Sequence, residues 1–313
     1  MTTIGYNQKI VLLKYGFYDI KFHNMDSVCY FIVNLLSYLL PVRLAHLITR
    51  LAANVLFHTV YKNARRNVEN NLMFIFGDKL KRWKRKQLIF ETFQSFAFFI
   101  YEFAIMRKIN QKTYKNFVNP VGFENVERAL EKGKGVIIVT GHLGNWEWGA
   151  ALLTYLGYHA IVIATRFKNP FVTRYYYNQR TKQGLEVIYL EDAVKKTLKK
   201  LKSNGIVAIV GDRDYTNQGT EISFFGKMTR FPTGALLLGL RTGAPVIPCF
   251  AIRRGMCKYD VIFSSPIKMM SKGYREEEFK EDMSRWAKIL EGYIRKYPSQ
   301  WYRFQPFWEP EKV

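Results

Sequence analysis

The chain has 313 residues, enough for one large α/β domain with an additional N-terminal element, and its 24 Phe, 20 Tyr and 6 Trp make it rich in aromatic side chains. Its 48 Lys and Arg against 25 Asp and Glu give a formal net charge of +23, which favours an anionic partner: nucleic acid, an acidic membrane, a phosphorylated substrate or an acidic protein. The three cysteines form no Cys-x-x-Cys pair, so the sequence indicates neither a zinc site nor a disulfide framework.

The first long apolar stretch covers residues 28–60 and comes after a polar start, residues 1–26, which lacks the apolar core of a secretory signal. Its most apolar part, residues 28–42, is shorter than the ~20 residues that a spanning helix needs. Pro41, Arg43 and Arg50 interrupt the rest of the stretch. The pattern favours a helical hairpin lying in the membrane interface over a single marginal span or a buried helix of a soluble domain.

Two further helices are expected before the pattern changes. Residues 61–72 form a basic helical start, and residues 79–86 hold six Lys and Arg around Trp83. This run suits a membrane interface or a solvated helix face, but without interleaved aromatic platforms it does not indicate nucleic-acid binding. Residues 88–106, with seven aromatic side chains, predict a long helix that is either buried or lipid-facing.

From residue 122 the strand and helix patterns alternate. Strands are expected at residues 135–139, 160–164, 186–189, 206–210, 245–251 and 259–263, and helices at 124–131, 145–156, 170–184, 192–202, 233–242 and 276–296. This alternation predicts an α/β fold with a mostly parallel sheet flanked by helices on both faces. We therefore divide the chain into an N-terminal helical, membrane-associated region, residues 1–113, and an α/β domain, residues 114–313.

The sharpest candidate site comes directly after the first of these strands. His142 lies in a turn bounded by Gly141 and Gly144, Asn145 is placed to cap the next helix, and Glu147 falls in the first turn of that helix. A carboxylate there can accept a hydrogen bond from the imidazole Nδ1–H and leave Nε2 to take a proton from a hydroxyl. We interpret His142 as a general base with Glu147 as its orienting partner, in preference to a structural histidine beside a glutamate that complements the helix dipole.

Other polar residues come after the ends of later strands, where sites lie in open α/β sheets. Arg166 could bind a phosphate or a phosphopantetheine group, or be an ordinary surface cation. Asp212, Arg213 and Asp214 suggest an ion-pair network more than a metal-binding diacid, because no third ligand stands at fixed spacing.

Two more segments are candidates for lining the site. Thr233 and Gly234 begin a helix whose backbone N–H groups could hold an anion or an oxyanion. Phe224 and Phe225 could line an apolar channel, although core packing is the simpler interpretation. We expect neither a metal nor a cofactor.

The segment Gly-His-Leu-Gly-Asn-Trp-Glu at residues 141–147 resembles the bacterial lipid A biosynthesis (lauroyl/myristoyl) acyltransferases, within the lysophospholipid acyltransferase superfamily and its His-x-x-x-x-acid motif. The resemblance runs from about residue 63 to residue 308. Its further blocks lie at residues 65–72, 166–170, 212–214, 224–226, 232–234, 242–248 and 297–301. Asp-Arg-Asp with Pro-Thr-Gly also resembles a sister group, the phosphatidylinositol mannoside acyltransferases.

The resemblance implies a membrane-associated O-acyltransferase at the cytoplasmic face of the inner (plasma) membrane, peripheral or single-pass. The acyl chain would pass from acyl carrier protein or acyl-CoA to a hydroxyl of an anionic membrane glycolipid. The acceptor would be of the lipid A (lipopolysaccharide) precursor type or, alternatively, phosphatidylinositol mannoside or another phospholipid. A non-catalytic basic lipid-binding protein and a hydrolase remain as other hypotheses, and nucleic acid is not an expected partner.

The resemblance also assigns roles to residues. His142 would be the base and Glu147 its partner. The predicted substrate-binding set comprises Asn145, Arg166, Asp212, Arg213, Asp214, Thr233 and Gly234.

Overall fold

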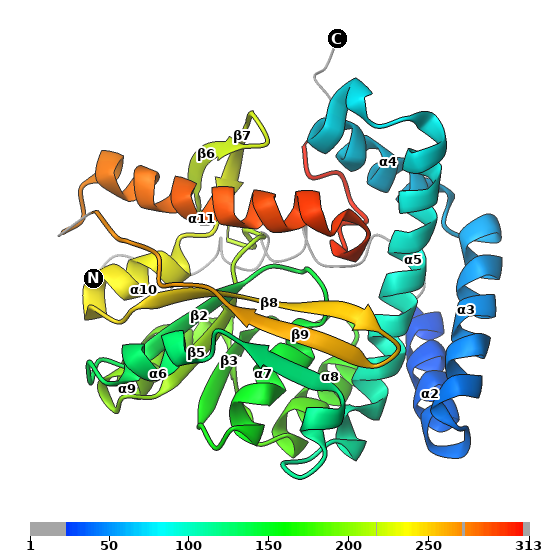
Figure 1. Cartoon of the computed structure of the whole chain (residues 1–313), viewed down its shortest axis with the longest axis horizontal. Helices are drawn as coiled ribbons and strands as arrows, with labels where there is room; N and C mark the ends of the chain where they lie inside the picture. Colours follow the sequence, from blue (N-terminus) through cyan, green and yellow to red (C-terminus); the bar gives the residue numbers. More distant parts are fainter. Residues whose placement is uncertain (1–22, 217, 271–272, 309–313) are drawn as a thin grey trace, which may run out of the picture.

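The computed structural model describes residues 23–216, 218–270 and 273–308, so most of the polar start of the chain lies outside the described residues. Seven strands form one sheet in the order β1-β9-β8-β2-β5-β3-β4, and every neighbouring pair is parallel except β8 and β9 (Figure 1). In chain order these strands are β1 (Val118–Val121), β2 (Val136–Thr140), β3 (Ala160–Ala164), β4 (Glu186–Tyr189), β5 (Ile206–Val210), β8 (Val246–Gly255) and β9 (Lys258–Phe263). The predicted mostly parallel sheet is confirmed.

Helices cover both faces of this sheet, because its central strands are apolar on both sides. Along β2, Val136 and Ile138 belong to one hydrophobic cluster, whereas Ile137 and Val139 belong to a second one on the other face. The first cluster includes side chains of α6 (Glu124–Leu130), α7 (Trp146–Tyr155) and α8 (Pro170–Lys182). The second includes side chains of α9 (Ala193–Lys202), α10 (Gly234–Thr242) and α11 (Glu276–Lys296). The continuous apolar run of β2 is therefore the signature of a strand buried on both faces.

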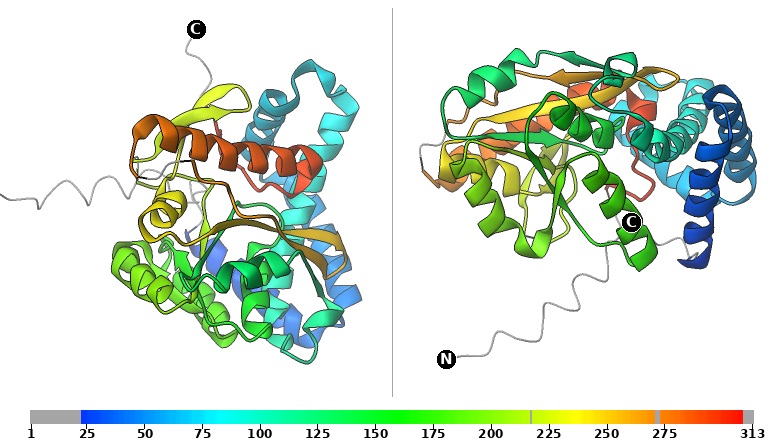
Figure 2. Two further views of the ribbon diagram at one scale, coloured as in Figure 1. Left: turned by 60° about the vertical axis from the view of Figure 1, so that its left-hand side comes forward. Right: turned by 90° about the horizontal axis from the view of Figure 1, so that it is seen from below.

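Four helices precede the sheet in the described part of the chain: α2 (His23–Leu39), α3 (Val42–Thr59), α4 (Lys62–Phe76) and α5 (Arg82–Ile105). Helices α2 and α3 form the expected hairpin, with Pro41 between them, and both lie beside α5 at one end of the molecule (Figures 1 and 2). Tyr30 of α2, Ala45 of α3 and Tyr101 of α5 are buried in the same hydrophobic cluster as Trp148 of α7. The helical region and the sheet thus share one core.

Among the described helices, only the stretch Arg82–Lys108 is long and apolar enough to cross a bilayer, and 56% of its apolar window is buried inside the protein. The aromatic side chains of α5 fill the space between the α2–α3 hairpin and the sheet: Tyr101 and Phe103 are at most 1% exposed. The predicted helix is therefore a core helix in its C-terminal part, where residues 101–105 are all buried.

Three features of the fold were not predicted from the sequence. Strand β1 was not expected, and the antiparallel hairpin of β6 (Thr220–Phe224) and β7 (Lys227–Phe231) was interpreted only as an apolar channel or core segment. Phe224 and Phe231 of this hairpin are fully buried, so core packing is the correct interpretation. Strand β8 is longer than expected and turns back into β9 as an antiparallel pair.

Candidate active site

Two neighbouring strands carry the centre of the site. Strands β2 and β5 are paired in parallel, with Thr140 opposite Val210 at their carboxyl ends. His142 and Asp212 each lie two residues beyond that pair, so the register of the sheet sets them side by side. Ligand sites of open α/β sheets lie at such carboxyl ends.

His142 and Asp212 make two hydrogen bonds with each other. The imidazole Nδ1 lies 2.6 Å from Oδ1 of Asp212, and the backbone N–H of His142 donates to Oδ2 at 3.0 Å. Asp212 is 1% exposed and His142 is 6% exposed. Burial alone would raise the pKa of the Asp212 carboxyl, but His142 and Arg213 hold it well below its usual range. Because an ionised carboxylate only accepts hydrogen bonds, Nδ1 carries the proton and Nε2 is the basic nitrogen of His142.

The pKa of His142 is lowered. Its burial and the nearby Arg213 guanidinium disfavour the imidazolium more strongly than the Asp212 carboxylate favours it, and Arg303 acts in the same direction as Arg213. The imidazole is therefore neutral near pH 7, which is the state that a proton acceptor requires.

The turn that carries His142 is fixed by backbone contacts with two other segments. The Tyr302 N–H donates to the His142 carbonyl at 3.0 Å, and the N–H of Gly144 donates to Gln300 O at 2.9 Å. Gly144 has a φ of +66°, and a Cβ at this position would lie 1.9 Å from the carbonyl oxygen of Ala251. Only glycine lets the turn approach β8 this closely.

The prediction that Glu147 orients His142 is wrong. Glu147 forms a two-pronged ion pair with Arg180 of α8, with Nε to Oε2 at 2.9 Å and Nη2 to Oε1 at 2.6 Å. The indole N–H of Trp146 also donates to Oε1, at 3.1 Å. Although burial opposes its charge, the Glu147 carboxylate raises the pKa of Arg180. Glu147 lies in the first turn of α7, as expected, but α7 directs it to α8, and Asp212 occupies the place beside Nδ1.

Asn145 and Asp214, two members of the predicted substrate-binding set, are used by the protein itself. Asn145 caps α7, as predicted, by accepting a hydrogen bond from the Trp148 N–H at 3.2 Å, and it is fully buried. Asp214 ties together its own loop by accepting from the N–H groups of Thr216 at 2.9 Å and Gly219 at 2.8 Å. Asn145 does not line the cavity beside His142. The prediction that Asn145 binds substrate is therefore corrected: its side chain caps α7.

Arg166 lies away from His142. Its side chain is 53% exposed, pairs with Glu191 at 3.5 Å and stacks on the ring of Tyr189 at 3.8 Å from the centroid. Its neighbours Thr165 and Phe167 line the cavity, whereas Arg166 itself does not. A role for Arg166 in binding phosphate stays a prediction, and it concerns the rim of the site.

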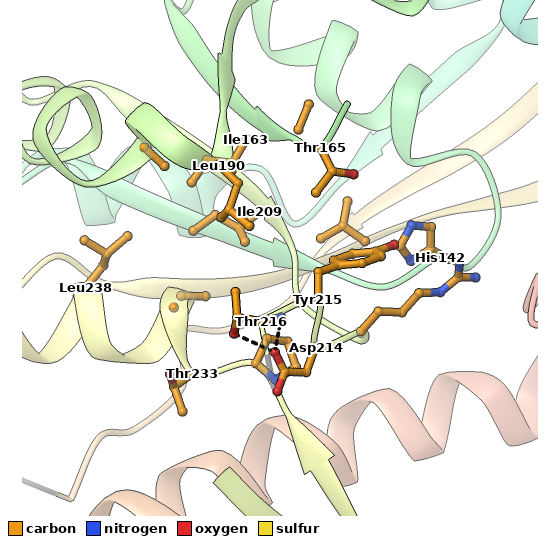
Figure 3. A pocket seen from close by; sticks show the side chains of 18 of the residues that line it. His142, Ile163, Thr165, Leu190, Ile209, Asp214, Tyr215, Thr216, Thr233 and Leu238 are labelled. Atoms are coloured by element: carbon orange, nitrogen blue, oxygen red, sulfur yellow. Dashed lines mark hydrogen bonds between the residues drawn. The ribbon is translucent and has the colours of Figure 1, made fainter. Parts of the chain in front are cut away.

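A cavity of about 680 Å³ runs past His142. One part of it lies between α9 and α10, and another part is lined by the Glu147–Arg180 pair and by aromatic side chains of α2, α5 and α8. Figure 3 shows His142 and Tyr215 at one side of this cavity and Leu190, Ile163 and Leu238 toward the other. Thr233 also lies on the side away from His142 (Figure 3), so the start of α10 is not placed to hold an oxyanion formed at His142. The cavity therefore joins a polar end with a basic imidazole to a largely apolar end that suits a hydrocarbon chain.

A second buried polar cluster connects α3, α5 and the β8–β9 hairpin. His46 Nε2 lies 3.2 Å from Oε1 of Glu102 and 3.5 Å from Sγ of Cys257. These three residues could by distance hold a metal ion, since their ligand atoms lie within 4.8 Å of one another. However, Glu102 already accepts hydrogen bonds from Arg253 and Tyr259. Because the positive charge of Arg253 lies beside the Glu102 carboxylate, these residues are unsuitable for holding a cation. The cluster instead anchors α3 to the sheet.

Several residues of the site were not singled out from the sequence: Arg180, Tyr215, Tyr302 and Arg303. Arg180 meets Glu147 only because α8 packs beside α7, and local spacing carries no signal of that contact. Asp212 was singled out, but its partner depends on β5 being inserted next to β2 in the sheet.

An α/β sheet with a buried histidine–carboxylate pair at its carboxyl edge, facing a cavity with an apolar end, defines a class of proteins that can activate a hydroxyl beside a lipid chain. The chain belongs to the bacterial lipid A biosynthesis acyltransferase family, whose family model matches residues 22–309.

Individual proteins to which the chain is similar are acyltransferases by name. The chain is similar to phosphatidylinositol mannoside acyltransferases from two strains of Mycobacterium tuberculosis, with 29% identity over 140 residues, 43% of this chain and 44% of theirs. A phosphatidylinositol mannoside acyltransferase from Mycolicibacterium smegmatis is 24% identical over 196 residues, 60% of this chain and 61% of that protein. The matched segment thus spans less than two thirds of each relative. Among solved structures, the 1-acyl-sn-glycerophosphate acyltransferase PlsC from Thermotoga maritima aligns over 84% of this chain and 100% of that chain, with a TM-score of 0.34 and 16% identity.

Proposed function

We propose that this protein is a membrane-associated O-acyltransferase that moves a fatty acyl chain from a thioester donor to a hydroxyl of a membrane glycolipid. The single observation that carries the proposal is the His142–Asp212 pair, 2.6 Å between Nδ1 and Oδ1, at the polar end of a cavity whose other end is apolar. Family membership supports the same reaction class.

The step needs no protein nucleophile. Nε2 of His142 takes the proton of the acceptor hydroxyl while its oxygen attacks the thioester carbonyl, forming a C–O bond. When the tetrahedral intermediate collapses, the C–S bond breaks. The sulfur takes the proton from His142, so the carrier leaves as a thiol and Nε2 is basic again. Asp212 holds the imidazole in the correct tautomer and stabilises the transient imidazolium, as carboxylates do in other histidine-based sites.

We propose a glycolipid as the acceptor, because the mycobacterial relatives are phosphatidylinositol mannoside acyltransferases and the family is named for lipid A. The donor is an acyl thioester of acyl carrier protein or of CoA. Both donors and both acceptors are anionic, and the formal charge of +23 suits them.

We propose further that α3 lies on the cytoplasmic face of the plasma membrane. One stripe of this helix exposes Leu44, Leu47, Leu51 and Val55, each between 44% and 60% exposed. Arg43 and Arg50 are on the same helix and can reach anionic headgroups. An apolar stripe with neighbouring arginines fits an interfacial helix better than it fits water.

The activity is tested by incubating the purified protein with palmitoyl-CoA or palmitoyl carrier protein and either a lipid A precursor or a phosphatidylinositol mannoside. Mass spectrometry identifies the acylated product, and release of thiol without acceptor measures hydrolysis. We expect transfer that is abolished in His142→Gln, which keeps the side-chain size and loses the base. Acylation that persists in His142→Gln, or thiol release that no glycolipid accelerates, would contradict the proposed function.

The membrane surface is tested separately by flotation with vesicles of phosphatidylglycerol and phosphatidylethanolamine. Leu47→Glu together with Leu51→Glu is expected to reduce binding strongly, because two charges enter the apolar stripe. Leu51→Glu alone is compared with Met228→Glu, which adds the same single charge, since Met228 is 67% exposed but lies on the β6–β7 hairpin. If the α3 variants float with the vesicles as the wild type does, α3 does not contact the bilayer.

A further inference from the structure

The part of the cavity that does not lie between α9 and α10 has a wall of connected side chains. From His142 this wall passes to Trp146, whose ring centroid lies 4.8 Å from that of the imidazole, and then to Glu147, which accepts from the indole N–H. It continues through Arg180, which pairs with Glu147 and lies 5.3 Å over the ring of Tyr176. All of these residues line the cavity, and we call this region its aromatic part.

Helix α2 lies at the other end of the aromatic part. Tyr30 of α2 lines the cavity, and its ring centroid is 5.8 Å from that of Tyr176. The two hydroxyl oxygens are 3.2 Å apart, which is hydrogen-bond distance. Phe96 and Phe99 of α5 complete the lining, and Phe99 stacks on Trp146 at 4.4 Å. The aromatic part therefore runs from the base at His142 to the inner face of α2.

The outer face of α2 is apolar and exposed. Ile32, Leu35 and Leu39 are 46%, 44% and 68% exposed, and their spacing of three and four residues places them on one stripe. Tyr30 lies on the inner face and is 9% exposed. A helix with its side chains is about 10–12 Å across, so this distance separates the outer stripe from the aromatic part. Because α2 forms one hairpin with α3, the aromatic part is the part of the cavity next to the surface that is proposed to face the membrane.

The two parts of the cavity differ in chemistry and in position. The aromatic part offers ring faces beside an ion pair whose two charges, on Glu147 and Arg180, compensate each other. A sugar ring has apolar C–H faces and hydroxyl edges, so both kinds of surface find a partner there. The part between α9 and α10 is lined mainly by aliphatic side chains such as Leu190 and Leu238, which suits an acyl chain. Helices α9 and α10 also lie on the side of the molecule away from the α2–α3 hairpin (Figure 1).

We propose that the aromatic part of the cavity binds the sugar headgroup of the acceptor glycolipid, which reaches it from the α2 side. The proposal rests on the proposed function and on its membrane-facing hairpin. An acceptor whose own chains stay in the bilayer has to reach His142 from the membrane surface, whereas a thioester of CoA or of a carrier protein comes from water. The acceptor hydroxyl then meets Nε2 of His142 beside Trp146, and the acyl chain of the donor takes the part between α9 and α10.

The first test measures binding, so it does not depend on acyl transfer. The probes are the deacylated, water-soluble headgroups of a phosphatidylinositol mannoside and of a lipid A precursor. Glycerol 3-phosphate serves as an anion without a sugar ring, and dodecanoyl-CoA probes the donor site. We expect the wild type to bind one of the two sugar headgroups more tightly than glycerol 3-phosphate in isothermal titration calorimetry.

The variants are Tyr176→Leu and Tyr30→Leu, each of which removes one ring, with Tyr177→Leu as the matched control. Tyr177 is the next residue on α8 and is 42% exposed, but it does not line the cavity. Tyr176→Leu and Tyr30→Leu should each weaken binding of the sugar headgroup by about fivefold or more, the range expected for an aromatic contact. Tyr177→Leu should leave it unchanged. Both cavity variants should keep their affinity for dodecanoyl-CoA, which also shows that they are folded.

The second test places the headgroup at the α2 end of the cavity. Tyr30→Cys and Leu35→Cys put a thiol on the inner and on the outer face of α2, each in a chain that also carries Cys29→Ser. The native Cys249 and Cys257 are buried. The sugar headgroup should slow the alkylation of Tyr30→Cys by iodoacetamide and leave that of Leu35→Cys unchanged.

Several results would overturn the proposal. If Tyr176→Leu and Tyr30→Leu bind the headgroup as the wild type does, or if dodecanoyl-CoA is the probe that loses affinity or protects Tyr30→Cys, the aromatic part does not bind the acceptor. A wild type that binds neither sugar headgroup more tightly than glycerol 3-phosphate contradicts it as well. Because neither test requires turnover, a protein that binds the headgroup in this way and transfers no acyl chain would contradict the proposed function and leave this site standing.

Discussion

Oδ1 of Asp212 lies 2.6 Å from Nδ1 of His142, although the two residues are 70 positions apart in the chain. The contact is a consequence of the sheet: β2 and β5 are paired in register, and each residue comes two positions after its strand. An acid that binds Nδ1 of the base is therefore supplied by a second strand and not by the helix that comes after His142.

Replacement of Asp212 by Asn tests this relationship. An amide cannot hold the Nδ1–H tautomer as a carboxylate does, and we expect the rate of acyl transfer to fall by roughly a thousandfold or more. Loss of the carboxylate also lowers the pKa of His142 further, so the acid limb of kcat/KM should move to lower pH. The pH profile of Asp212→Asn checks both effects, and Asp214→Asn is the comparison. If the acid limb of kcat/KM in Asp212→Asn lies at the same pH as in the wild type, Asp212 has a purely structural role.

The pH profile of the wild-type enzyme is a second prediction. Burial and Arg213 lower the pKa of His142, so the acid limb of kcat/KM should lie below the ordinary histidine value of about 6.5. Activity is then full above that limb and is lost as the pH falls through the pKa and His142 takes up a proton. Arg303→Gln removes a cation that disfavours the imidazolium, so it should move the limb to higher pH. A shift in the opposite direction would show that Arg303 does not act on His142.

Glu147 and Arg180 are expected to act on the scaffold of the site. Glu147 is 3% exposed and Arg180 14% at the side chain, so removing one partner leaves an uncompensated charge. We expect Glu147→Ala to lower the free energy of unfolding by about 3 kcal/mol. The double variant Glu147→Ala, Arg180→Ala should lose less than the sum of the single variants. Denaturant unfolding measures these values. If the acid limb of the kcat/KM profile moves in Glu147→Gln, Glu147 contributes to orienting His142.

Much of the fold could be predicted because the apolar runs and their spacing are local properties. The α/β alternation, the α2–α3 hairpin and the Asn145 cap were all predictable from such patterns. The partner of His142 could not be predicted, because nothing local places β5 next to β2. The helix-dipole argument placed Glu147 correctly in the first turn of α7 but could not reveal Arg180, which α8 brings from 33 residues away. The strands of the β6–β7 hairpin alternate exposed and more buried residues, but each has only five residues, so the pattern is too short to separate them from a loop.

The turn that carries His142 should tolerate no side chain at Gly144. Gly144→Ala forces a left-handed backbone that costs about 1–2 kcal/mol and adds a clash with Ala251 O. Gly157→Ala is the control, since Gly157 also has a positive φ of +91° but has nothing within 4 Å of its added Cβ. We expect Gly144→Ala to lose clearly more stability than Gly157→Ala and to lose activity, whereas Gly157→Ala keeps it. Thermal unfolding and acyl transfer measure the difference, and equal losses would place the cost in the backbone conformation alone.

The apolar end of the cavity should set the length of the acyl chain. Leu238 of α10 lines the cavity on the side away from His142 (Figure 3), so Leu238→Trp fills the space that the end of a long chain would occupy. We expect the preference in competition between dodecanoyl and hexadecanoyl donors to shift toward the shorter chain, because overpacking an apolar site costs about 1–3 kcal/mol. Leu240→Trp on the same helix, outside the cavity lining, is the control. If both variants slow the two donors equally, the chain does not enter between α9 and α10, and another part of the cavity must receive it.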